Sequence, residues 1–207
     1  MRFQLPKIYP ITDLLISGIS IPEQVDRLIA GGATLIQLRE KHASSGDFYE
    51  AAQFALEIAR TRGVRIIVND RVDIAMALKA DGVHLGQNDL PCMHARRILG
   101  DDAIIGLSTH STEQAIAALC LPINYIAIGP VFSTTTKADP AAVVGLQGLS
   151  RVRSLIGDFP LVAIGGITES NLKSVLETGV DSAAIITGLV SEAGRITQKM
   201  QAFLQQS

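Results

Sequence analysis

Several polar side chains follow short apolar runs in this chain, and their types suit phosphate and metal chemistry. The clearest case is LIQLREKH, residues 35–42, where Gln37, Arg39 and Lys41 occupy alternate positions after an apolar start. Side chains at alternate positions of a strand point to the same face. An amide and two cations are therefore predicted to share one face. The net charge of the whole chain is −2, so these cations form a local cluster on a protein that is not basic overall. Such a local cluster is predicted to bind an anion.

Two carboxylates follow the next two apolar runs. Asp70 ends RIIVND after Asn69, and Asp89 ends the loop GQND. Carboxylates beside cations favour Mg²⁺, which usually takes one or two carboxylates together with waters and substrate phosphates. Plainer roles stay open at this point: Asp70 can pair with Arg71 or cap the next helix, and Asp89 can act as a helix N-cap.

Hydroxyl groups and glycines follow the remaining apolar runs and suit a second anion. Exposed backbone N–H groups beside glycines bind phosphate well, and in barrels a phosphate is often held by the loops after the seventh and eighth strands. In this chain those loops are IGGIT and ITGL. The groups are Ser108, Thr109 and His110 after the fifth run; Thr134, Thr136 and Lys137 in GPVFSTTTKADP; Gly165 and Gly166; and Ile186, Thr187 and Gly188.

The elements that must position these groups alternate along the chain. Runs rich in Ile, Val and Leu with little alternation of polarity predict strands buried on both faces, as in a parallel sheet. Eight strand–helix units with right-handed crossovers favour a (β/α)8 TIM barrel, whose active site lies at the carboxyl ends of the strands. A doubly wound open sheet is the rival, but the loop TDLLISGIS lacks the glycine pattern that it needs. The predicted strands are 7–12, 34–39, 65–70, 82–87, 103–108, 125–130, 160–166 and 183–188, and the predicted helices are 22–32, 45–63, 73–80, 91–100, 111–120, 148–157, 168–179 and the tail from Ser191.

Composition limits the class of protein. We expect residues 1–207 to form a single barrel domain, because 47% hydrophobic and 18% charged residues are typical of a globular chain. The mixed charges exclude a nucleic-acid surface and a polybasic membrane patch, and no apolar run reaches the length of a membrane span. Cys92 and Cys120 lack metal spacing and are read as small hydrophobes in a reducing, cytoplasmic protein. Homo-oligomer formation is left open.

Six segments in order resemble the thiamin phosphate synthase family: QLREK, VNDRVDIA, ADGVHLGQND, GLSTH, GPVFSTTTK and VAIGGIT. The resemblance spans about Tyr9 to Gly188. It implies a transferase of thiamine biosynthesis that joins 4-amino-5-hydroxymethyl-2-methylpyrimidine diphosphate to a thiazole phosphate, with Mg²⁺ as cofactor and release of diphosphate. The choice between the carboxylated and decarboxylated thiazole stays open. The implied mechanism is a dissociative displacement, in which the protein positions both substrates and stabilises charge.

The resemblance also implies the role of each site residue. Small phosphorylated molecules are the expected partners, and the cations are expected to act in catalysis as diphosphate leaves. The implied catalytic residues are Arg39, Lys41 and Lys137; the pyrimidine diphosphate site is Gln37, Arg39, Lys41, Asn69 and Lys137; the thiazole phosphate site is Ser108, Thr134, Thr136, Gly166, Ile186 and Thr187; and the metal ligands are Asp70 and Asp89.

One departure from the family pattern keeps other functions open. Thr187-Gly188 stands where the family has Ser-Ala, and a glycine there resembles the sister group of thiazole tautomerases, for which His110 would be the acid/base. A third hypothesis is a sensor that binds thiamin phosphate without turnover. His84, in the middle of a predicted strand, is interpreted as structural. Residues 133–143 are predicted to close over the bound substrates and exclude water.

Overall fold

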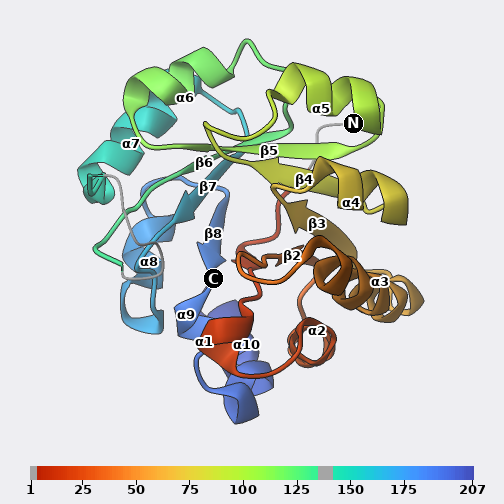
Figure 1. Cartoon of the computed structure of the whole chain (residues 1–207). Helices are drawn as coiled ribbons and strands as arrows, with labels where there is room; N and C mark the ends of the chain where they lie inside the picture. The colour runs from red at the N-terminus through yellow and green to blue at the C-terminus, as the bar shows by residue number, and fades with distance from the viewer. Residues whose placement is uncertain (1–3, 135–141) are drawn as a thin grey trace.

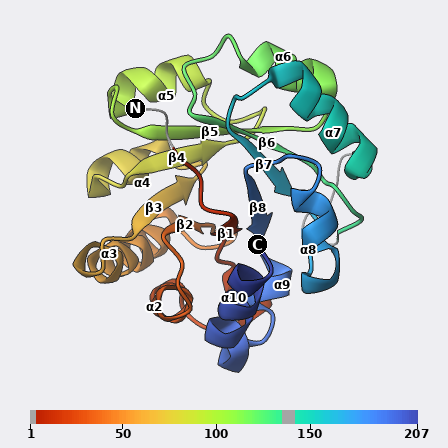
Figure 2. The ribbon, with the colours of Figure 1, turned by 180° about the vertical axis from the view of Figure 1, so that it is seen from behind.

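The chain folds into a nearly closed barrel of eight parallel strands with helices outside it (Figure 1). This computed structural model describes residues 4–134 and 142–207. Figures 1 and 2 show the helices following one another around the barrel in chain order. The strands are β1 (Ile8–Pro10), β2 (Leu35–Leu38), β3 (Arg65–Asn69), β4 (Gly82–Leu85), β5 (Ile104–Thr109), β6 (Tyr125–Ile128), β7 (Leu161–Ile164) and β8 (Ser182–Ile185).

The sheet order confirms the barrel and excludes the doubly wound alternative. Neighbouring strands run β1-β8-β7-β6-β5-β4-β3-β2, and every pair is parallel. The seam between β1 and β2 is joined by an isolated bridge between Ile11 and Gln37, and the Thr12 backbone N donates to the Gln37 carbonyl at 2.9 Å. The barrel therefore closes at the carboxyl end of β2, where the polar residues begin.

Helices cover the outside of the barrel, and several begin at serine caps. The hydroxyl of Ser44 accepts from the backbone N of Asp47 at 3.1 Å, and that of Ser111 accepts from Gln114 at 3.3 Å. Such caps satisfy N–H groups that a helix leaves unpaired at its start. The helices are α1 (Leu14–Ser17), α2 (Ile21–Ala30), α3 (Ser45–Thr61), α4 (Val72–Leu78), α5 (Cys92–Leu99), α6 (Thr112–Ala118), α7 (Gly145–Ile156), α8 (Glu169–Leu176), α9 (Thr187–Val190), a 3₁₀ turn (Ala193–Arg195) and α10 (Ile196–Gln205).

Two short helices were not expected from the sequence. α1 follows β1, with Asp13 as its N-cap, and α9 begins directly after β8. The predicted eighth strand, 183–188, is thus too long at its end, because Thr187 and Gly188 lie in α9. Isoleucine and threonine favour strands locally, but here tertiary context decides the conformation.

Two hydrophobic layers hold the barrel together. One lies between strands and helices, and the other fills the barrel itself, as alternate side chains of each strand point inward. In β3, for example, Ile67 faces inward while Ile66 and Val68 pack against the helices. The interior layer contains two tyrosines, Tyr9 and Tyr125, whose hydroxyls require partners. None of the described helices is long and apolar enough to cross a membrane.

Candidate active site at the carboxyl ends of the strands

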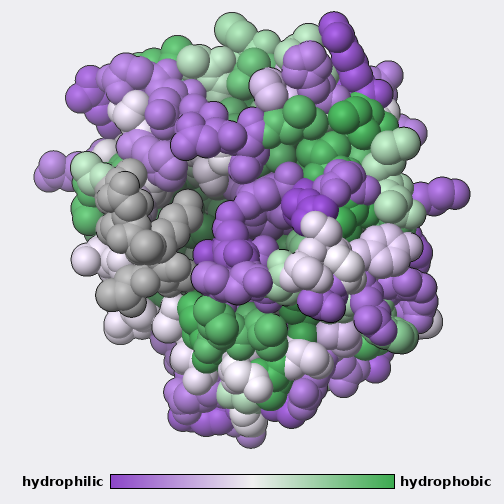
Figure 3. Space-filling model, viewed as in Figure 1, coloured by the Kyte–Doolittle hydropathy of each residue, from purple (hydrophilic) through white to green (hydrophobic). Residues whose placement is uncertain are grey.

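A cavity of about 700 Å³ opens at the carboxyl ends of β5 to β8. It is bordered by residues from the ends of these strands and from the loops that follow them. Figure 3 shows hydrophilic side chains crossing the middle of the face seen in Figure 1, above a hydrophobic patch at the place of α1, whose Leu14 and Leu15 are exposed. Six of the predicted site residues line the cavity: Arg39, Ser108, Thr134, Gly166, Ile186 and Thr187.

Glycines at the end of β7 shape one wall of this cavity. Gly166 has φ +65°, and a Cβ there would lie 2.7 Å from the Cβ of Phe132. Gly165 has φ +105°, and a Cβ there would lie 2.6 Å from the Cα of Pro130. The backbone N of Phe132 donates to the carbonyl of Gly165 at 3.1 Å. The pair is therefore required both by its backbone conformation and by the close packing of the β6 and β7 loops.

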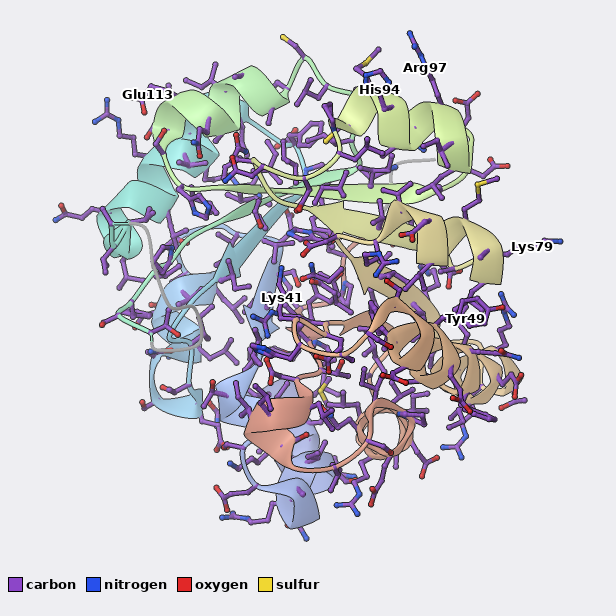
Figure 4. All side chains as sticks on the ribbon, viewed as in Figure 1. Lys41, Tyr49, Lys79, His94, Arg97 and Glu113 are labelled. Carbon is purple, nitrogen blue, oxygen red and sulfur yellow. The ribbon has the colours of Figure 1, made fainter. Side chains whose placement is uncertain are left out.

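The second group of predicted residues lies at the ends of β2, β3 and β4. Lys41 forms an ion pair with Asp70, and the side chains are 40% and 24% exposed. Figure 4 shows Lys41 over the middle of the barrel, whereas His94 and Arg97 point outward at the periphery. Arg71 pairs with Asp73 at 2.5 Å, so the plain pairing of Asp70 with Arg71 is wrong. The chain thus brings the lysine of one strand end to the carboxylate of the next.

Asp89 belongs to the same cluster. Its Oδ2 accepts from the backbone N of Gly86 at 2.6 Å, and Pro91 is the N-cap of α5, so the N-cap role expected as an alternative for Asp89 is wrong. Burial raises the pKa of Asp89, and the neighbouring Asp70 carboxylate raises it further, while the Gly86 N–H and Lys41 oppose this. The two carboxylates therefore lie close enough to repel each other.

The carboxylate pair fits a hard divalent cation. Two like charges at one place are relieved by a metal ion, and Mg²⁺ needs no more than one or two carboxylates when phosphates supply other ligands. In the described residues no group of three or more His, Cys, Asp and Glu side chains forms a cage for a metal. Asp70 and Asp89 thus suit an ion held jointly with a ligand, whereas a closed structural site would need more donors from the protein.

Arg39 connects the two groups, because it lines the cavity and lies two residues before Lys41 in sequence. Its guanidinium forms an ion pair with Asp13, and both side chains are nearly buried, at 12% and 9% exposed. Its backbone N donates to the hydroxyl of Thr12 at 3.2 Å. Asp13 was missed in the sequence, although it directly follows the first predicted strand and the rule that found the other residues would have found it.

Gln37 and His84 lie deeper, inside the barrel. Gln37 is 2% exposed, and its Nε2 donates to the hydroxyl of Tyr9 at 3.1 Å. His84 bonds Tyr125 and Ser108 through its two ring nitrogens, in keeping with the structural role expected of it.

His110 lines the cavity, with its Nδ1 2.6 Å from the carbonyl of Gly129. Asn69 is the last residue of β3. Thr134 is the last described residue before 135–141. Outside the described residues lie Thr136, Lys137 and most of the predicted closing segment 133–143.

Together these features define a (β/α)8-barrel enzyme with a polar, cation-bearing mouth beside a carboxylate pair. The family model described as thiamine monophosphate synthase matches residues 8–189. The chain belongs to this family of transferases, which confirms the resemblance seen in the sequence.

Curated and solved relatives agree with the family. The chain is 47% identical over 184 residues to the thiamine-phosphate synthase of Syntrophomonas wolfei, with 88% of each chain covered. It is 46% identical over 185 residues to that of Clostridium novyi, covering 89% of this chain and 90% of the relative. The solved thiamine phosphate pyrophosphorylase from Pyrococcus furiosus superimposes with a TM-score of 0.85 at 36% identity, over 96% of this chain and 95% of the other.

Proposed function

We propose that this chain is a thiamin phosphate synthase that joins 4-amino-5-hydroxymethyl-2-methylpyrimidine diphosphate to a thiazole phosphate. The observation that carries the proposal is the carboxylate pair Asp70 and Asp89 with Lys41 and Arg39 beside the cavity. Such a cluster suits a diphosphate held with Mg²⁺, and the cavity at β5 to β8 suits a second phosphate. The names of the curated relatives support the same activity.

The residues divide the work between two substrates. The pyrimidine diphosphate is bound by Gln37, Arg39, Lys41, Asn69 and Lys137. Asp70 and Asp89 would hold Mg²⁺, which when bound would supply positive charge to the diphosphate. The thiazole phosphate is bound by Ser108, Thr134, Thr136, Gly166, Ile186 and Thr187.

The reaction is a dissociative displacement. The C–O bond to diphosphate breaks, and its electron pair leaves with the diphosphate oxygen. The resulting pyrimidine-methyl cation is attacked by the lone pair of the thiazole nitrogen, which forms the new C–N bond. Arg39, Lys41 and Lys137 stabilise the developing negative charge and need not move when it appears, which is the main source of catalysis in such sites. No side-chain nucleophile takes part, so the remaining task of the protein is to hold the two reacting atoms together.

Product formation tests the proposal directly. The protein is mixed with both substrates, with Mg²⁺ or with a chelator, and thiamin phosphate is detected after oxidation to fluorescent thiochrome. Mg²⁺-dependent turnover is expected. A folded protein that forms no thiamin phosphate under either condition contradicts the proposal.

A thiazole tautomerase is the second candidate, and the geometry of His110 favours testing it. Since a carbonyl only accepts, the contact of Nδ1 with the Gly129 carbonyl places the proton of a neutral His110 on Nδ1 and leaves Nε2 as a base. Tautomerisation that needs no Mg²⁺ and is lost in His110→Ala would support this function. Retained tautomerisation in that variant would exclude it.

The proposed function also concerns the number of domains and the cellular location of the enzyme. We infer one domain over residues 1–207 acting in the cytoplasm, in keeping with the free thiols of Cys92 and Cys120. A single cooperative unfolding transition followed by two optical probes would support the single domain. Two separate transitions would contradict it.

A further inference from the structure

A chain of buried hydrogen bonds crosses the interior of the barrel and joins two predicted site residues. The Nε2 of Gln37 donates to the hydroxyl of Tyr9 at 3.1 Å, and this hydroxyl lies 3.0 Å from that of Tyr125. The Tyr125 hydroxyl lies 2.9 Å from His84 Nδ1, and His84 Nε2 lies 2.8 Å from the hydroxyl of Ser108. We call Gln37, Tyr9, Tyr125, His84 and Ser108 the interior chain. It links β2, β1, β6, β4 and β5 without a break.

The barrel is built to let this chain form. Gly106 lies between His84 and Tyr125 in the sheet register, and a Cβ on it would lie 2.0 Å from the Cζ of Tyr125. The glycine leaves space for the Tyr125 ring to cross β5 and stack on His84, with ring centres 5.5 Å apart and planes at 25°. Tyr9 and Tyr125 are 1% and 0% exposed, so water does not replace these bonds. The interior chain is thus a packed feature of the core.

The chain has a direction, because each hydroxyl has a single proton. If the Gln37 amide donates to Tyr9, then Tyr9 donates to Tyr125 and Tyr125 donates to His84 Nδ1. The proton of a neutral His84 then lies on Nε2 and is donated to Ser108. The proton of Ser108 is left for an acceptor in the cavity that this residue lines.

The hydrogen bonds of the interior chain can also all run in the reverse direction, which leaves different groups unused at Gln37 and Ser108. In this direction the Gln37 amide is flipped, so that its carbonyl oxygen accepts from Tyr9. The proton of a neutral His84 lies on Nδ1 and is donated to Tyr125, and Ser108 donates its proton to His84 Nε2. The ionised oxygens of a phosphate only accept hydrogen bonds. An anion at Ser108 therefore selects the first direction, in which the Gln37 carbonyl oxygen remains an acceptor for an amino group.

We propose that Tyr9, Tyr125 and His84 are positioning residues that couple the Ser108 hydroxyl to the orientation of the Gln37 amide. Binding of an anionic oxygen at one end thereby prepares the other end for the amino group of an aminopyrimidine. Such coupling between two sites is reciprocal, because each ligand favours the same state. The proposal rests on the proposed function for the identity of the two ligands, whereas the direction that the chain takes with phosphate bound can be measured without either substrate.

The first experiment measures the His84 tautomer by ¹⁵N NMR, without any substrate of the proposed reaction. Inorganic phosphate at saturating concentration is the probe, and the His84 signals are identified by their loss in His84→Gln. The expected result is a neutral ring protonated on Nε2 in the phosphate-bound protein. A ring protonated on Nδ1 alone overturns the proposal, even if the protein makes thiamin phosphate.

The second experiment is a double-mutant cycle in the coupling assay. Tyr125→Phe removes only the hydroxyl and is expected to lower kcat/KM about tenfold, which is an effect of the size found for residues that share one hydrogen-bond network. In a Ser108→Ala background the same change is expected to have no further effect. A full tenfold loss in both backgrounds would show that Tyr125 acts independently of Ser108 and would overturn the proposal.

Controls separate this role from folding and from the proposed function. Tyr49→Phe deletes a hydroxyl on the exposed face of α3 and should leave kcat/KM unchanged. Thermal unfolding monitors each variant, and Tyr9→Phe replaces Tyr125→Phe if the latter does not fold. A wild-type protein that forms no thiamin phosphate refutes the proposed function, while the tautomer measurement still decides the direction of the chain.

Discussion

The environment of Arg39 shows how one carboxylate can serve two purposes at the residue scale. Asp13 Oδ1 accepts from the backbone N of Ile16 at 3.1 Å and caps α1, while Oδ2 holds the Arg39 guanidinium. The backbone N of Asp13 is bonded in turn to the buried amide of Gln24 at 3.0 Å. The guanidinium is therefore aimed before any substrate arrives, which lowers the entropic cost of using it.

Substitution of Asp13 should lower activity more than its helix cap alone explains. We expect Asp13→Ala to cost about 1–3 kcal/mol of unfolding free energy and to reduce kcat/KM about tenfold, because Arg39 loses its partner as α1 loses its cap. Asp13→Asn should keep the cap and recover most of the stability but little of the activity. Ser44→Ala removes the cap of α3 and serves as control. Equal activity losses in Asp13→Ala and Ser44→Ala would contradict a role through Arg39.

The carboxylate of Asp70 gives a prediction about metal dependence. Asp70→Asn should raise the Mg²⁺ concentration for half-maximal coupling by about tenfold or more, because one of two proposed ligands loses its charge. The measurement is initial rate against free Mg²⁺. Asp73→Asn is the matched control, since Asp73 lies on α4, pairs with Arg71 and is mostly exposed. An unchanged Mg²⁺ requirement in Asp70→Asn would remove Asp70 from the metal site.

At the scale of elements, β5 needs a glycine at position 106, because the ring of Tyr125 from β6 crosses β5 there to stack on His84 from β4. Gly106→Ala would place a Cβ among the ring atoms of Tyr125, so either the ring or the strand must move. Overpacking of this kind costs about 1–3 kcal/mol. We expect a loss of that size in urea unfolding, together with loss of the stacking between Tyr125 and His84.

A second glycine supplies the control for this change. Gly194 has no atom within 4 Å of a Cβ built on it, and Gly194→Ala should change the unfolding free energy by no more than about 0.5 kcal/mol. If Gly106→Ala is equally well tolerated, Tyr125 does not need the space that we assign to it.

The long elements could be predicted from the sequence because burial on both faces leaves a plain hydrophobic pattern. Every predicted strand overlaps an observed one, and the predicted helices that start at Ser111 and Thr168 correspond to α6 and α8, for which these two residues are the N-caps. The four-residue helices α1 and α9 could not be predicted, since they contain too few residues for a period to show.

Some residues of the candidate site could likewise be predicted from the sequence, and others could not. The polar strand ends were visible because each interrupts an apolar run, and the structure brings six of the predicted residues, from five strand ends, to one cavity. The interior chain was not visible, because Tyr9 and Tyr125 lie 116 residues apart and read as ordinary core positions. Only the closed barrel brings their hydroxyls together, so such a feature belongs to the fold as a whole.

For the whole molecule, the barrel interior makes stability sensitive to alkaline pH. Burial raises the pKa of both Tyr9 and Tyr125 in the folded state, although the hydrogen bonds that Tyr9 forms with Tyr125 and Gln37 oppose the shift at Tyr9. In the unfolded chain a tyrosine ionises at a pH of about 10. Above that pH the folded state binds more protons than the unfolded state, so stability must fall as pH rises.

This loss can be measured as a slope. Each buried tyrosine should contribute a decline of up to about 1.4 kcal/mol per pH unit above a pH of about 10, and none below about 9. Unfolding free energies from urea titrations across this range should therefore decline less steeply in Tyr125→Phe than in the wild type, while the two curves stay parallel below about pH 9. Equal slopes above pH 10 would show that Tyr125 ionises inside the folded barrel, which a tyrosine enclosed between Tyr9 and His84 could do only if water enters the interior chain.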